Sequence, residues 1–301
     1  MELVNRTGLP SQRRLNFRKW FRNFRFKTLI TILIIPGAIL FIAPFLWMLS
    51  TSLKDPKMVY IFPPQIIPNP ALWSNYLRAM TRLPFQDYAL NTIQITVLCL
   101  IGHLVTASMT AYGFARLRFP GRDFLFILLI SSIMLPTQVT LIPTFIIFRY
   151  LGWVDTFKPL IVPDWLGGVP FTVFLLRQFM TSIPIELDEA AKIEGANFFD
   201  IYWRIILPLI KPALGAVTIF VFLWNWNDFY YAVIYINSQN KWTLQLALNA
   251  LHRSSAAPDR SFMEMEILMA ASIVIMLPCL IIFFFAQRLF IQGIVITGVK
   301  G

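Results

Sequence analysis

The sequence predicts an all-α integral membrane protein with six transmembrane helices, and three observations favour this fold class. Of its 301 residues, 57% are hydrophobic and only 14% are charged, whereas soluble domains carry about 25% charged residues. Six apolar stretches each approach the roughly 20 residues that an α-helix needs to cross a bilayer. The net charge of +11 is concentrated toward one side of these stretches, as in membrane proteins. These features exclude an ordinary soluble fold, and they favour membrane lipid over nucleic acid as the partner of the basic residues.

The chain divides into a tail and a membrane domain. Residues 1–27 carry eight basic side chains and one acid, Glu2, which predicts a basic cytoplasmic tail that contacts lipid headgroups. The first apolar stretch follows this tail and is too long for a cleavable signal peptide. We therefore expect the remaining residues, 28–301, to form one six-helix transmembrane domain that includes a C-terminal tail at 291–301.

The six predicted spans differ in how regular they are. The first three contain no charged residue, whereas the fifth contains Asp228. The fourth is weaker because Pro163, Asp164, a Gly-Gly pair and Pro170 interrupt it. Such irregular backbone is tolerated in a bilayer only where neighbouring protein or a cavity satisfies it, so this span is a candidate pore liner. The predicted spans are 28–50, 88–112, 124–148, 159–176, 212–236 and 267–290.

The basic residues predict the orientation of these spans. If the N-terminus is cytoplasmic, inner segments hold 17 of the 26 lysines and arginines, and outer segments hold nine. This excess predicts that both termini are cytoplasmic. Two long outer segments, 51–87 and 237–266, are then expected to fold over the outer mouth.

The segment 182–214 is the most highly charged stretch between two spans, and its residues predict two short helices at a corner. Acidic residues at 186, 188 and 189 suit the positive end of a helix dipole, and Gly195 suits a helix stop. Asn197 and Asp200 have the spacing of a capping box for a second helix, which Pro208 should interrupt. On the first helix one apolar face is expected to dock against a partner, and it contains Ile183, Leu187, Ala190 and Ala191.

This segment resembles the cytoplasmic coupling loop of ABC importer permeases. That loop is marked by Glu-Ala-Ala, a glycine four residues on, and then Ile-x-Leu-Pro; here these stand at Glu189-Ala190-Ala191, at Gly195 and at 205–208. The whole set between two apolar spans is specific, whereas a lone Glu-Ala-Ala is common. The resemblance implies that Leu187, Glu189, Ala190, Ala191, Gly195 and Pro208 belong to a loop that couples to an ATPase.

Further stretches resemble the carbohydrate-importer branch, in particular its maltose-type smaller permease subunit. They lie at 110–116, 119–121, 134–136 and 226–229, so the likeness covers most of residues 29–301. It implies a type I importer fold in a prokaryotic plasma or inner membrane. It also implies that the chain's end contacts the ATPase subunits through Gly298, Val299, Lys300 and Gly301.

The resemblance also implies the partners. They are two ATP-binding subunits, expected as a homodimer, a second and different permease subunit, and an external solute-binding protein. The chain has no Walker A pattern, metal-ligand motif or catalytic motif. We therefore expect it to be no enzyme, to have no catalytic or metal site and to bind no cofactor, with ATP and Mg²⁺ bound by the partner ATPase.

Candidate solute-pathway residues cluster near the end of the fifth span. Polar groups at membrane depth tend to face cavities, and sugar hydroxyls and ring faces suit amide, carboxylate and aromatic side chains. The same residues also fit an aromatic belt with helix-capping groups, and both interpretations stay open. A secondary active transporter is the alternative function, because of the broken fourth span and Asp228, although inverted repeats are not visible. The candidates are Asn225, Trp226, Asn227, Asp228 and Tyr230.

Overall fold

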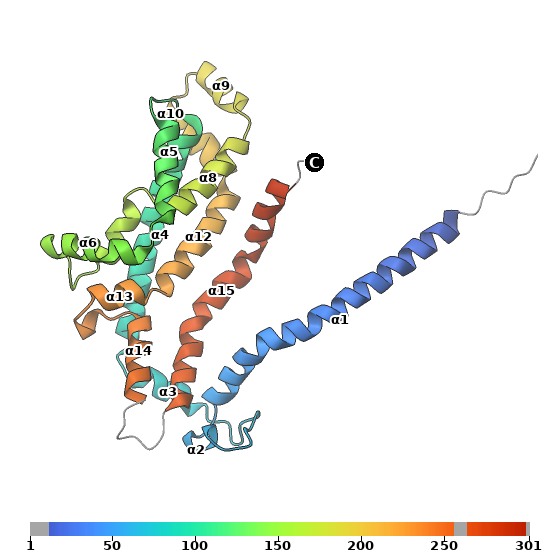
Figure 1. Cartoon of the computed structure of the whole chain (residues 1–301), viewed down its shortest axis with the longest axis vertical. Coiled ribbons are helices and arrows are strands. Elements are labelled where there is room, and N and C mark those ends of the chain that lie inside the picture. The colour runs from blue at the N-terminus through green and yellow to red at the C-terminus, as the bar shows by residue number, and fades with distance from the viewer. Residues whose placement is uncertain (1–11, 256–263, 299–301) are drawn as a thin grey trace, which may run out of the picture.

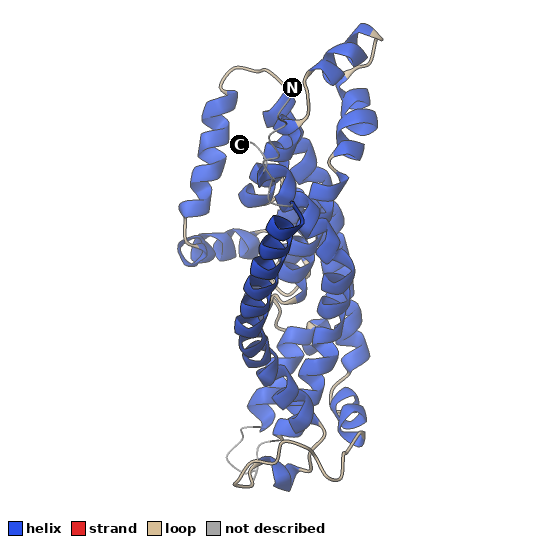
Figure 2. Ribbon diagram, turned by 90° about the vertical axis from the view of Figure 1, so that its right-hand side faces the viewer, coloured by secondary structure: helices blue, strands red, loops and turns tan. Residues whose placement is uncertain are grey.

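The protein is an elongated bundle of α-helices, seen here in a computed structural model that describes residues 12–255 and 264–298. Every regular element in these two ranges is helical (Figure 2). One end of the bundle carries α9, and the opposite end carries α2, α3 and one end of α14 (Figure 1). The long helices are α1 (Gln12–Ser52), α4 (Phe85–Arg116), α8 (Pro170–Ser182), α12 (Lys211–Trp226) and α15 (Met265–Gly298).

Shorter elements connect the long helices. At the α2 end of the bundle lie α2 (Pro56–Val59), α3 (Ser74–Thr81), η4 (Gln239–Lys241) and α14 (Leu244–Ser255). The middle is built from α5 (Arg122–Ser131), η1 (Ser132–Met134), α6 (Thr137–Tyr150), α7 (Lys158–Ile161), η2 (Val162–Trp165) and α13 (Tyr230–Tyr235). The α9 end comprises α9 (Glu186–Ile193), α10 (Phe198–Asp200), the π-helical η3 (Ile201–Ile206) and α11 (Leu207–Leu209).

Helix α4 is the centre of the bundle because it packs on both α8 and α12. Small residues on α4, Ala107 and Ala111, are fully buried where these helices meet. They pack against larger side chains such as Val173 and Leu176 of α8 and Val217 of α12. Burial of each such aliphatic side chain is worth about 1.5–3 kcal/mol in water, whereas in a bilayer close packing of small and large residues holds helices together.

The structure contains four helical segments that are long and apolar enough to span a membrane, among the residues it describes. Two further bent helix pairs raise this number to at most six. The unbent segments correspond to the first, second, fourth and sixth predicted spans. They are 34–52, 85–116, 158–182 and 265–285.

The third predicted span is not one continuous helix. The chain bends by 102° between residues 122–134 and 137–150, so that α6 lies across the bundle (Figure 1). Pro136 lies at this corner, where it removes a backbone donor and disfavours the helical conformation of Leu135; Leu135 is extended, with ψ of 116°. The predicted third span, 124–148, is therefore a bent pair of helices in the structure.

The fourth and fifth predicted spans are also irregular. The expected interruption of the fourth is confirmed, because α7, η2 and a loop at 166–169 precede α8. The fifth was expected to continue to residue 236, but α12 ends at Trp226 and the separate helix α13 follows. The chain therefore has broken backbone in both segments, at η2 and between α12 and α13.

Helix α1 diverges from the rest of the molecule (Figure 1). It packs mainly on α15, and Ser52 at its end is hydrogen-bonded to α3. Most of its described apolar side chains are exposed, as Leu40 at 74% and Phe41 at 78% show. An apolar helix that is largely exposed is suited to a bilayer or to another membrane subunit.

Candidate functional site

The first candidate region is α9 at one end of the bundle. Its first turn contains Glu186, Asp188 and Glu189, which stabilise the positive end of the helix dipole. The helix ends at Ile193, and Gly195 then adopts a left-handed backbone with φ of 87°. The predicted helix and its glycine stop are confirmed.

The second helix of this region begins as its sequence predicted. The Asn197 side chain accepts hydrogen bonds from the backbone N–H groups of Phe199 and Asp200, and the Asp200 carboxylate accepts from Asn197 N–H. This capping box leads into η3, a π-helical segment, and the chain then bends by 77° before α12. Pro208 lies between η3 and this bend, and a proline both removes a helical hydrogen bond and crowds the preceding turn.

Burial divides the expected apolar face of α9. Leu187 and Ala190 are exposed, as is the neighbouring Glu189. Ala191, in contrast, is only 8% exposed and packs in the chain's own core beside Tyr112 and Ile201. The prediction that Ala191 shares a free face with Leu187 and Ala190 is therefore wrong, because Ala191 faces the bundle.

A buried ion pair beneath α9 was not anticipated from the sequence. Asp188 is 2% exposed, and its Oδ2 lies 3.8 Å from Nε of Arg116 at the end of α4. Arg116 also donates two hydrogen bonds from Nη2, to the carbonyls of Met180 (2.7 Å) and Ile183 (2.9 Å). The guanidinium thus joins α4, the end of α8 and α9. The available sequence signal was an acidic residue, Asp188, close to Ala191 on the same helix.

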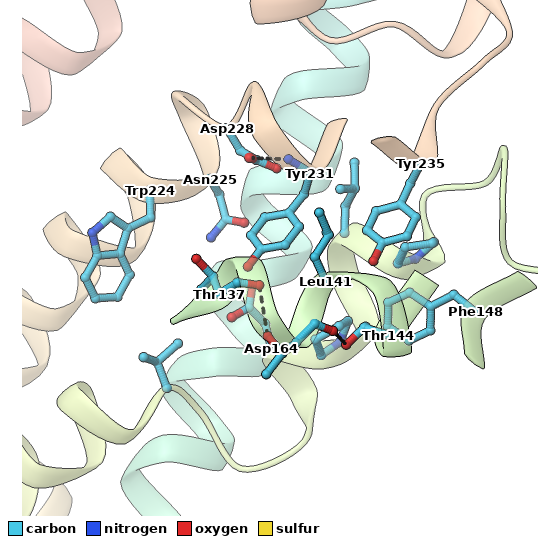
Figure 3. Close-up of a pocket in the computed structure, with 15 residues that line it drawn as sticks. Thr137, Leu141, Thr144, Phe148, Asp164, Trp224, Asn225, Asp228, Tyr231 and Tyr235 are labelled. Carbon is cyan, nitrogen blue, oxygen red and sulfur yellow. Dashed lines mark hydrogen bonds between the residues drawn. The ribbon is translucent and has the colours of Figure 1, made fainter. Parts of the chain in front are cut away.

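The second candidate region is a cavity of about 500 Å³ between α6, η2 and the segment that joins α12 to α13. Two predicted pathway residues, Asn225 and Asp228, line it (Figure 3). Asp228 is held in place because its Oδ1 accepts a hydrogen bond from the backbone N–H of Tyr231 at 3.1 Å.

The other three predicted pathway residues do not line this cavity. Trp226 is buried against Phe222 and donates from Nε1 to the carbonyl of Ile275. Asn227 donates to the carbonyl of Leu223, and Tyr230 is 41% exposed outside the cavity. The Trp226 side chain therefore packs helices together and the Asn227 side chain caps the end of α12, whereas the Tyr230 side chain faces the surroundings of the chain.

Several lining residues were missed because they come from separate elements. On α6, three threonines at positions 137, 140 and 144 follow helical spacing and share the face toward the cavity. That spacing within an apolar stretch was the available sequence signal. The remaining lining residues include Asp164 of η2 together with aromatic side chains, namely Phe148, Trp224, Tyr231 and Tyr235.

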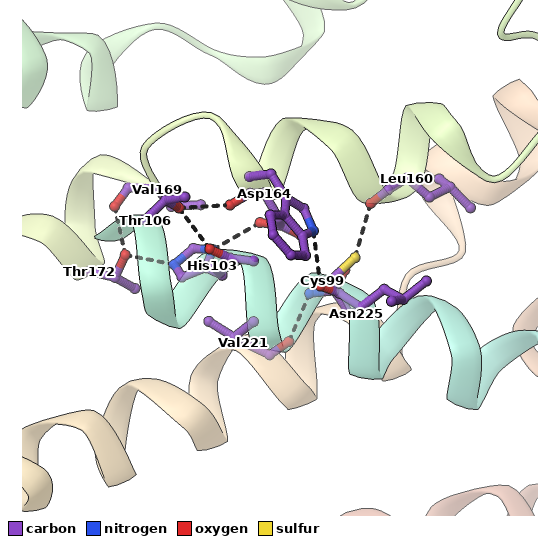
Figure 4. A network of polar contacts seen from close by, with 12 residues as sticks. Cys99, His103, Thr106, Leu160, Asp164, Val169, Thr172, Val221 and Asn225 are labelled. Atoms are coloured by element: carbon purple, nitrogen blue, oxygen red, sulfur yellow. Dashed lines mark hydrogen bonds and ion pairs between the residues drawn. The ribbon is translucent and has the colours of Figure 1, made fainter. Parts of the chain in front are cut away.

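A buried polar network holds Asp164 against α4 (Figure 4). The imidazole of His103, fully buried on α4, lies 2.9 Å through Nδ1 from Asp164 Oδ1 and 2.8 Å through Nε2 from the Thr172 hydroxyl. Thr106 donates to the backbone carbonyl of Asp164 at 3.2 Å. The network links α4, η2 and α8, and it fixes a carboxylate at the cavity wall.

The close approach of η2 to α4 depends on a glycine. A Cβ atom at Gly102 would lie 2.2 Å from Nε1 of Trp165, well inside van der Waals contact. That indole instead packs over Gly102 and donates to the carbonyl of Leu98 at 3.1 Å. Gly102 therefore allows η2, and with it Asp164, to lie directly on α4.

Of the four residues predicted to contact the ATPase subunits, the structure describes only the first. Gly298 is the last residue of α15, and Val299, Lys300 and Gly301 lie outside the described residues.

A bundle of apolar helices with broken spans around a cavity that contains carboxylates and hydroxyls is typical of membrane transport proteins. Comparison with known proteins identifies the group within that class. Residues 103–296 match the family described as binding-protein-dependent transport system inner membrane component. The chain belongs to this family and is a permease component of an ABC importer. This assignment favours the ABC importer over the alternative function, a secondary active transporter.

Individual relatives agree with this assignment. The chain is 33% identical over 265 residues to the inner membrane ABC transporter permease protein YcjP of Escherichia coli, covering 86% of this chain and 91% of that protein. It is 31% identical to the diacetylchitobiose uptake system permease protein NgcG of Streptomyces coelicolor, covering 88% and 86%. It is 28% identical to the sn-glycerol-3-phosphate transport system permease protein UgpE of Yersinia pestis, covering 88% and 94%.

A solved structure shows the same fold. A chain of a bacterial ABC transporter involved in the import of the acidic polysaccharide alginate superposes with a TM-score of 0.79 at 22% identity, covering 94% of this chain and 99% of that one.

Proposed function

We propose that the chain forms half of the translocation pathway of an ATP-driven importer for a sugar or a related solute, and that α9 couples this pathway to a separate ATPase subunit. The names of the relatives support the substrate class, since they include permeases for an amino-sugar disaccharide, for arabinooligosaccharides and for a glycerol phosphate. The polar and aromatic lining of the cavity supports it independently.

The observation that carries the coupling proposal is the combination of an exposed face and a buried anchor on one helix. Leu187 and Ala190 present apolar surface outward, while Asp188 on the other side is held by Arg116. A force applied to the exposed face is therefore transmitted to α4 and α8 and not absorbed by a mobile loop. Closure of an ATPase dimer against α9 would in this way rotate packed helices as rigid bodies.

Further contacts strengthen this mechanical link. The Tyr112 hydroxyl of α4 donates to the carbonyl of Phe198 at 3.1 Å, and Ser108 lies 2.7 Å from the Tyr202 hydroxyl. The second helix of the coupling region, α10 with η3, is thus hydrogen-bonded to α4, while α9 is joined to α4 by the Asp188–Arg116 ion pair. Helix α4 also carries His103 of the cavity network.

The partners follow from the family. A solute-binding protein is implied by the family description, and we propose that it docks on the outer end of the bundle, where α3 and α14 lie. Two ATP-binding subunits, as a homodimer, would bind the α9 end and hold ATP and Mg²⁺. A second permease subunit would complete the pore.

We further propose six spans with both termini in the cytoplasm of a prokaryotic cell, in its plasma or inner membrane. The excess of basic residues in the predicted inner segments supports this orientation. The C-terminal end of α15 points toward the same end of the bundle as α9 (Figure 1), as this topology requires. Residues 298–301 would then extend toward the ATPase subunits.

Reconstitution tests the proposal. The chain, its partner permease, the ATPase and the binding protein are placed in proteoliposomes, and uptake of radiolabelled oligosaccharides is measured with and without internal or external ATP. Uptake that requires both ATP on the α9 side and the binding protein on the other side is expected. Uptake driven by an ion gradient without ATP would contradict the proposal.

A further inference from the structure

The cavity between α6, η2 and α13 carries charge of one sign. Asp164 and Asp228 both line it, from different elements, and among the described lining residues there is no lysine or arginine. Its volume of about 500 Å³ is within the range of roughly 300–1,000 Å³ typical of small-ligand pockets. The charge of these two carboxylates therefore acts on any solute that enters.

His103 offsets part of that charge. Its Nδ1 faces Asp164 at 2.9 Å, and Nε2 faces the Thr172 hydroxyl at 2.8 Å. That hydroxyl also contacts the carbonyl of Val169 at 2.7 Å, and it has a single proton to give. If the Thr172 hydroxyl donates its proton to the carbonyl of Val169, then Nε2 of His103 must carry a proton and donate it to Thr172. A second proton then lies between Nδ1 of His103 and Asp164, and the His103–Asp164 pair has no net charge.

Among the described residues, no cationic side chain is paired with Asp228. Its Oδ1 accepts the backbone N–H of Tyr231, which orients the carboxylate without neutralising it. The N-terminus of α6, at Thr137, adds about half a positive charge. Even with a neutral His103–Asp164 pair, this half charge offsets only part of Asp228, and the cavity stays negative.

The rest of the lining is suited to hydroxyl groups. Thr140 and Thr144 of α6 already donate their hydroxyl protons to backbone carbonyls and can accept from a solute, whereas the hydroxyls of Tyr231 and Tyr235 can both donate and accept. The Tyr235 side chain is 1% exposed, and its hydroxyl has no hydrogen-bond partner among the described residues. A buried polar group without a partner costs about 1–3 kcal/mol, and a solute hydroxyl in the cavity would supply the missing partner.

We propose that this cavity is a solute-binding site of the permease itself, that it takes a neutral polyhydroxylated solute, and that Asp228 makes it select against anionic solutes such as uronates and phosphate esters. The inference rests on the proposed import function and names the charge class of its substrate. It assigns specificity to this subunit in addition to any selection by the binding protein.

Equilibrium dialysis tests the charge preference. The assembled transporter in lipid nanodiscs is dialysed, without the binding protein, against a mixture of neutral di- and trisaccharides, uronate oligosaccharides from alginate and pectin, and sn-glycerol 3-phosphate. Retained solutes are identified by mass spectrometry at low and at high salt. We expect at least a tenfold enrichment of a neutral sugar over every anion, and no such enrichment would overturn the proposal, as would preferential retention of a uronate, a phosphate ester or no solute.

Two matched variants test whether Asp228 causes the discrimination against anions. Asp228→Asn keeps an oxygen that accepts the Tyr231 N–H, so the fold is retained while the charge is lost; it should reduce the discrimination against anions by about fivefold or more. Asp123→Asn makes the same chemical change at a carboxylate that is 73% exposed and outside the cavity, and it should leave the ratio unchanged. Equal ratios in Asp228→Asn and the wild type would overturn the role of Asp228.

An error in the import function and an error in the charge selection give different experimental results. If the import function is wrong, the wild-type complex shows no ATP-dependent uptake. If only the charge selection is wrong, ATP-dependent uptake persists and the retained solutes show no preference for neutral sugars.

Discussion

At the scale of single residues, Asp188 and Arg116 determine how firmly α9 is attached to α4 and α8. Both side chains are almost completely buried, at 3% and 4% exposure, and Arg116 also caps two carbonyls at the end of α8. Two charges in such surroundings are stable only together, because removal of either leaves the other without compensation.

We expect Asp188→Asn to destabilise the protein by about 3–5 kcal/mol, as for other broken buried pairs. The loss should be recovered in part in the double variant Arg116→Met with Asp188→Leu, which removes both charges but leaves the carbonyls of Met180 and Ile183 without the Arg116 donor. Unfolding by denaturant in detergent micelles measures the difference. The exposed pair Arg122–Asp123, at 2.9 Å, provides the control: Asp123→Asn should change stability little because solvent screens an exposed pair. Equal losses in Asp188→Asn and Asp123→Asn would contradict the role of the buried pair.

Gly195 is a second residue with a defined role. Its φ of 87° is strained for any residue with a Cβ, and most of all for a β-branched one. Gly195→Val should therefore displace α9 and lower stability by roughly 1–2 kcal/mol, whereas Gly195→Asn should be nearly neutral because asparagine tolerates this conformation. Limited proteolysis at the α9 end compares the two, and similar cleavage in both would show that the glycine is not required.

At the scale of elements, the loop after α6 is fixed to the loop after α13 by Asp155. Its carboxylate accepts hydrogen bonds from the Ser238 hydroxyl and from the backbone N–H groups of Asn237 and Ser238, and Lys241 lies 3.2 Å from it. These donors, the Ser238 hydroxyl above all, hold the pKa of Asp155 well below its ordinary value. Folding therefore favours the ionised carboxylate.

The hydrogen bonds to the Asp155 carboxylate should make the stability of the protein sensitive to acid. Because the pKa is lower in the folded state, the stabilisation is fully present above the unfolded value of about 3.9 and is lost as pH falls below it. We expect wild type to be more stable than Asp155→Asn at pH 7 and the difference to shrink progressively as pH falls below about 3.9, vanishing only below the lowered pKa of the folded state. Thermal unfolding across pH measures this, and a difference that does not change with pH would refute the role of the charge.

The elements also show what could be predicted from sequence. Local signals were sufficient where one residue determines the backbone: Gly195 ended α9, and Asn197 began the next helix. They were insufficient at Pro136, because prolines are common inside transmembrane helices and the sequence does not show which one produces a corner. They also failed for Ala191, since periodicity defines an apolar face but not whether the chain's own bundle or a partner covers it.

The cavity was only partly predictable for the same physical reason. Asn225 and Asp228 were found because polar residues near the end of an apolar span are conspicuous. Asp164 was noticed only as an interruption of a span, since its proximity to His103 depends on packing across 61 positions of the chain. Contacts of this range follow from tertiary structure and not from local pattern.

At the scale of the whole molecule, topology is the first property to test. A single cysteine at Asn69, in the loop before α3, and another at Asn197, beside α9, should react with a membrane-impermeant reagent from opposite sides. The outer position should label in intact cells and the inner one only after lysis. Labelling of both in intact cells would exclude cytoplasmic placement of the α9 end.

In the proposed mechanism α9 transmits closure of the ATPase subunits to the helix bundle, and stimulated ATP hydrolysis by the reconstituted transporter measures this coupling. Ala190→Trp adds bulk on the exposed face, where overpacking costs about 1–3 kcal/mol, so ATPase affinity should fall by several-fold to about a hundredfold. Glu189→Lys should weaken binding by reversing a charge, while Ala190→Ser, which adds a single oxygen atom at the same exposed position, serves as the matched control. We predict that Ala190→Trp and Glu189→Lys both insert into the membrane but lose binding-protein-stimulated ATP hydrolysis, with the control unaffected; normal stimulation in both of these variants would contradict the mechanism.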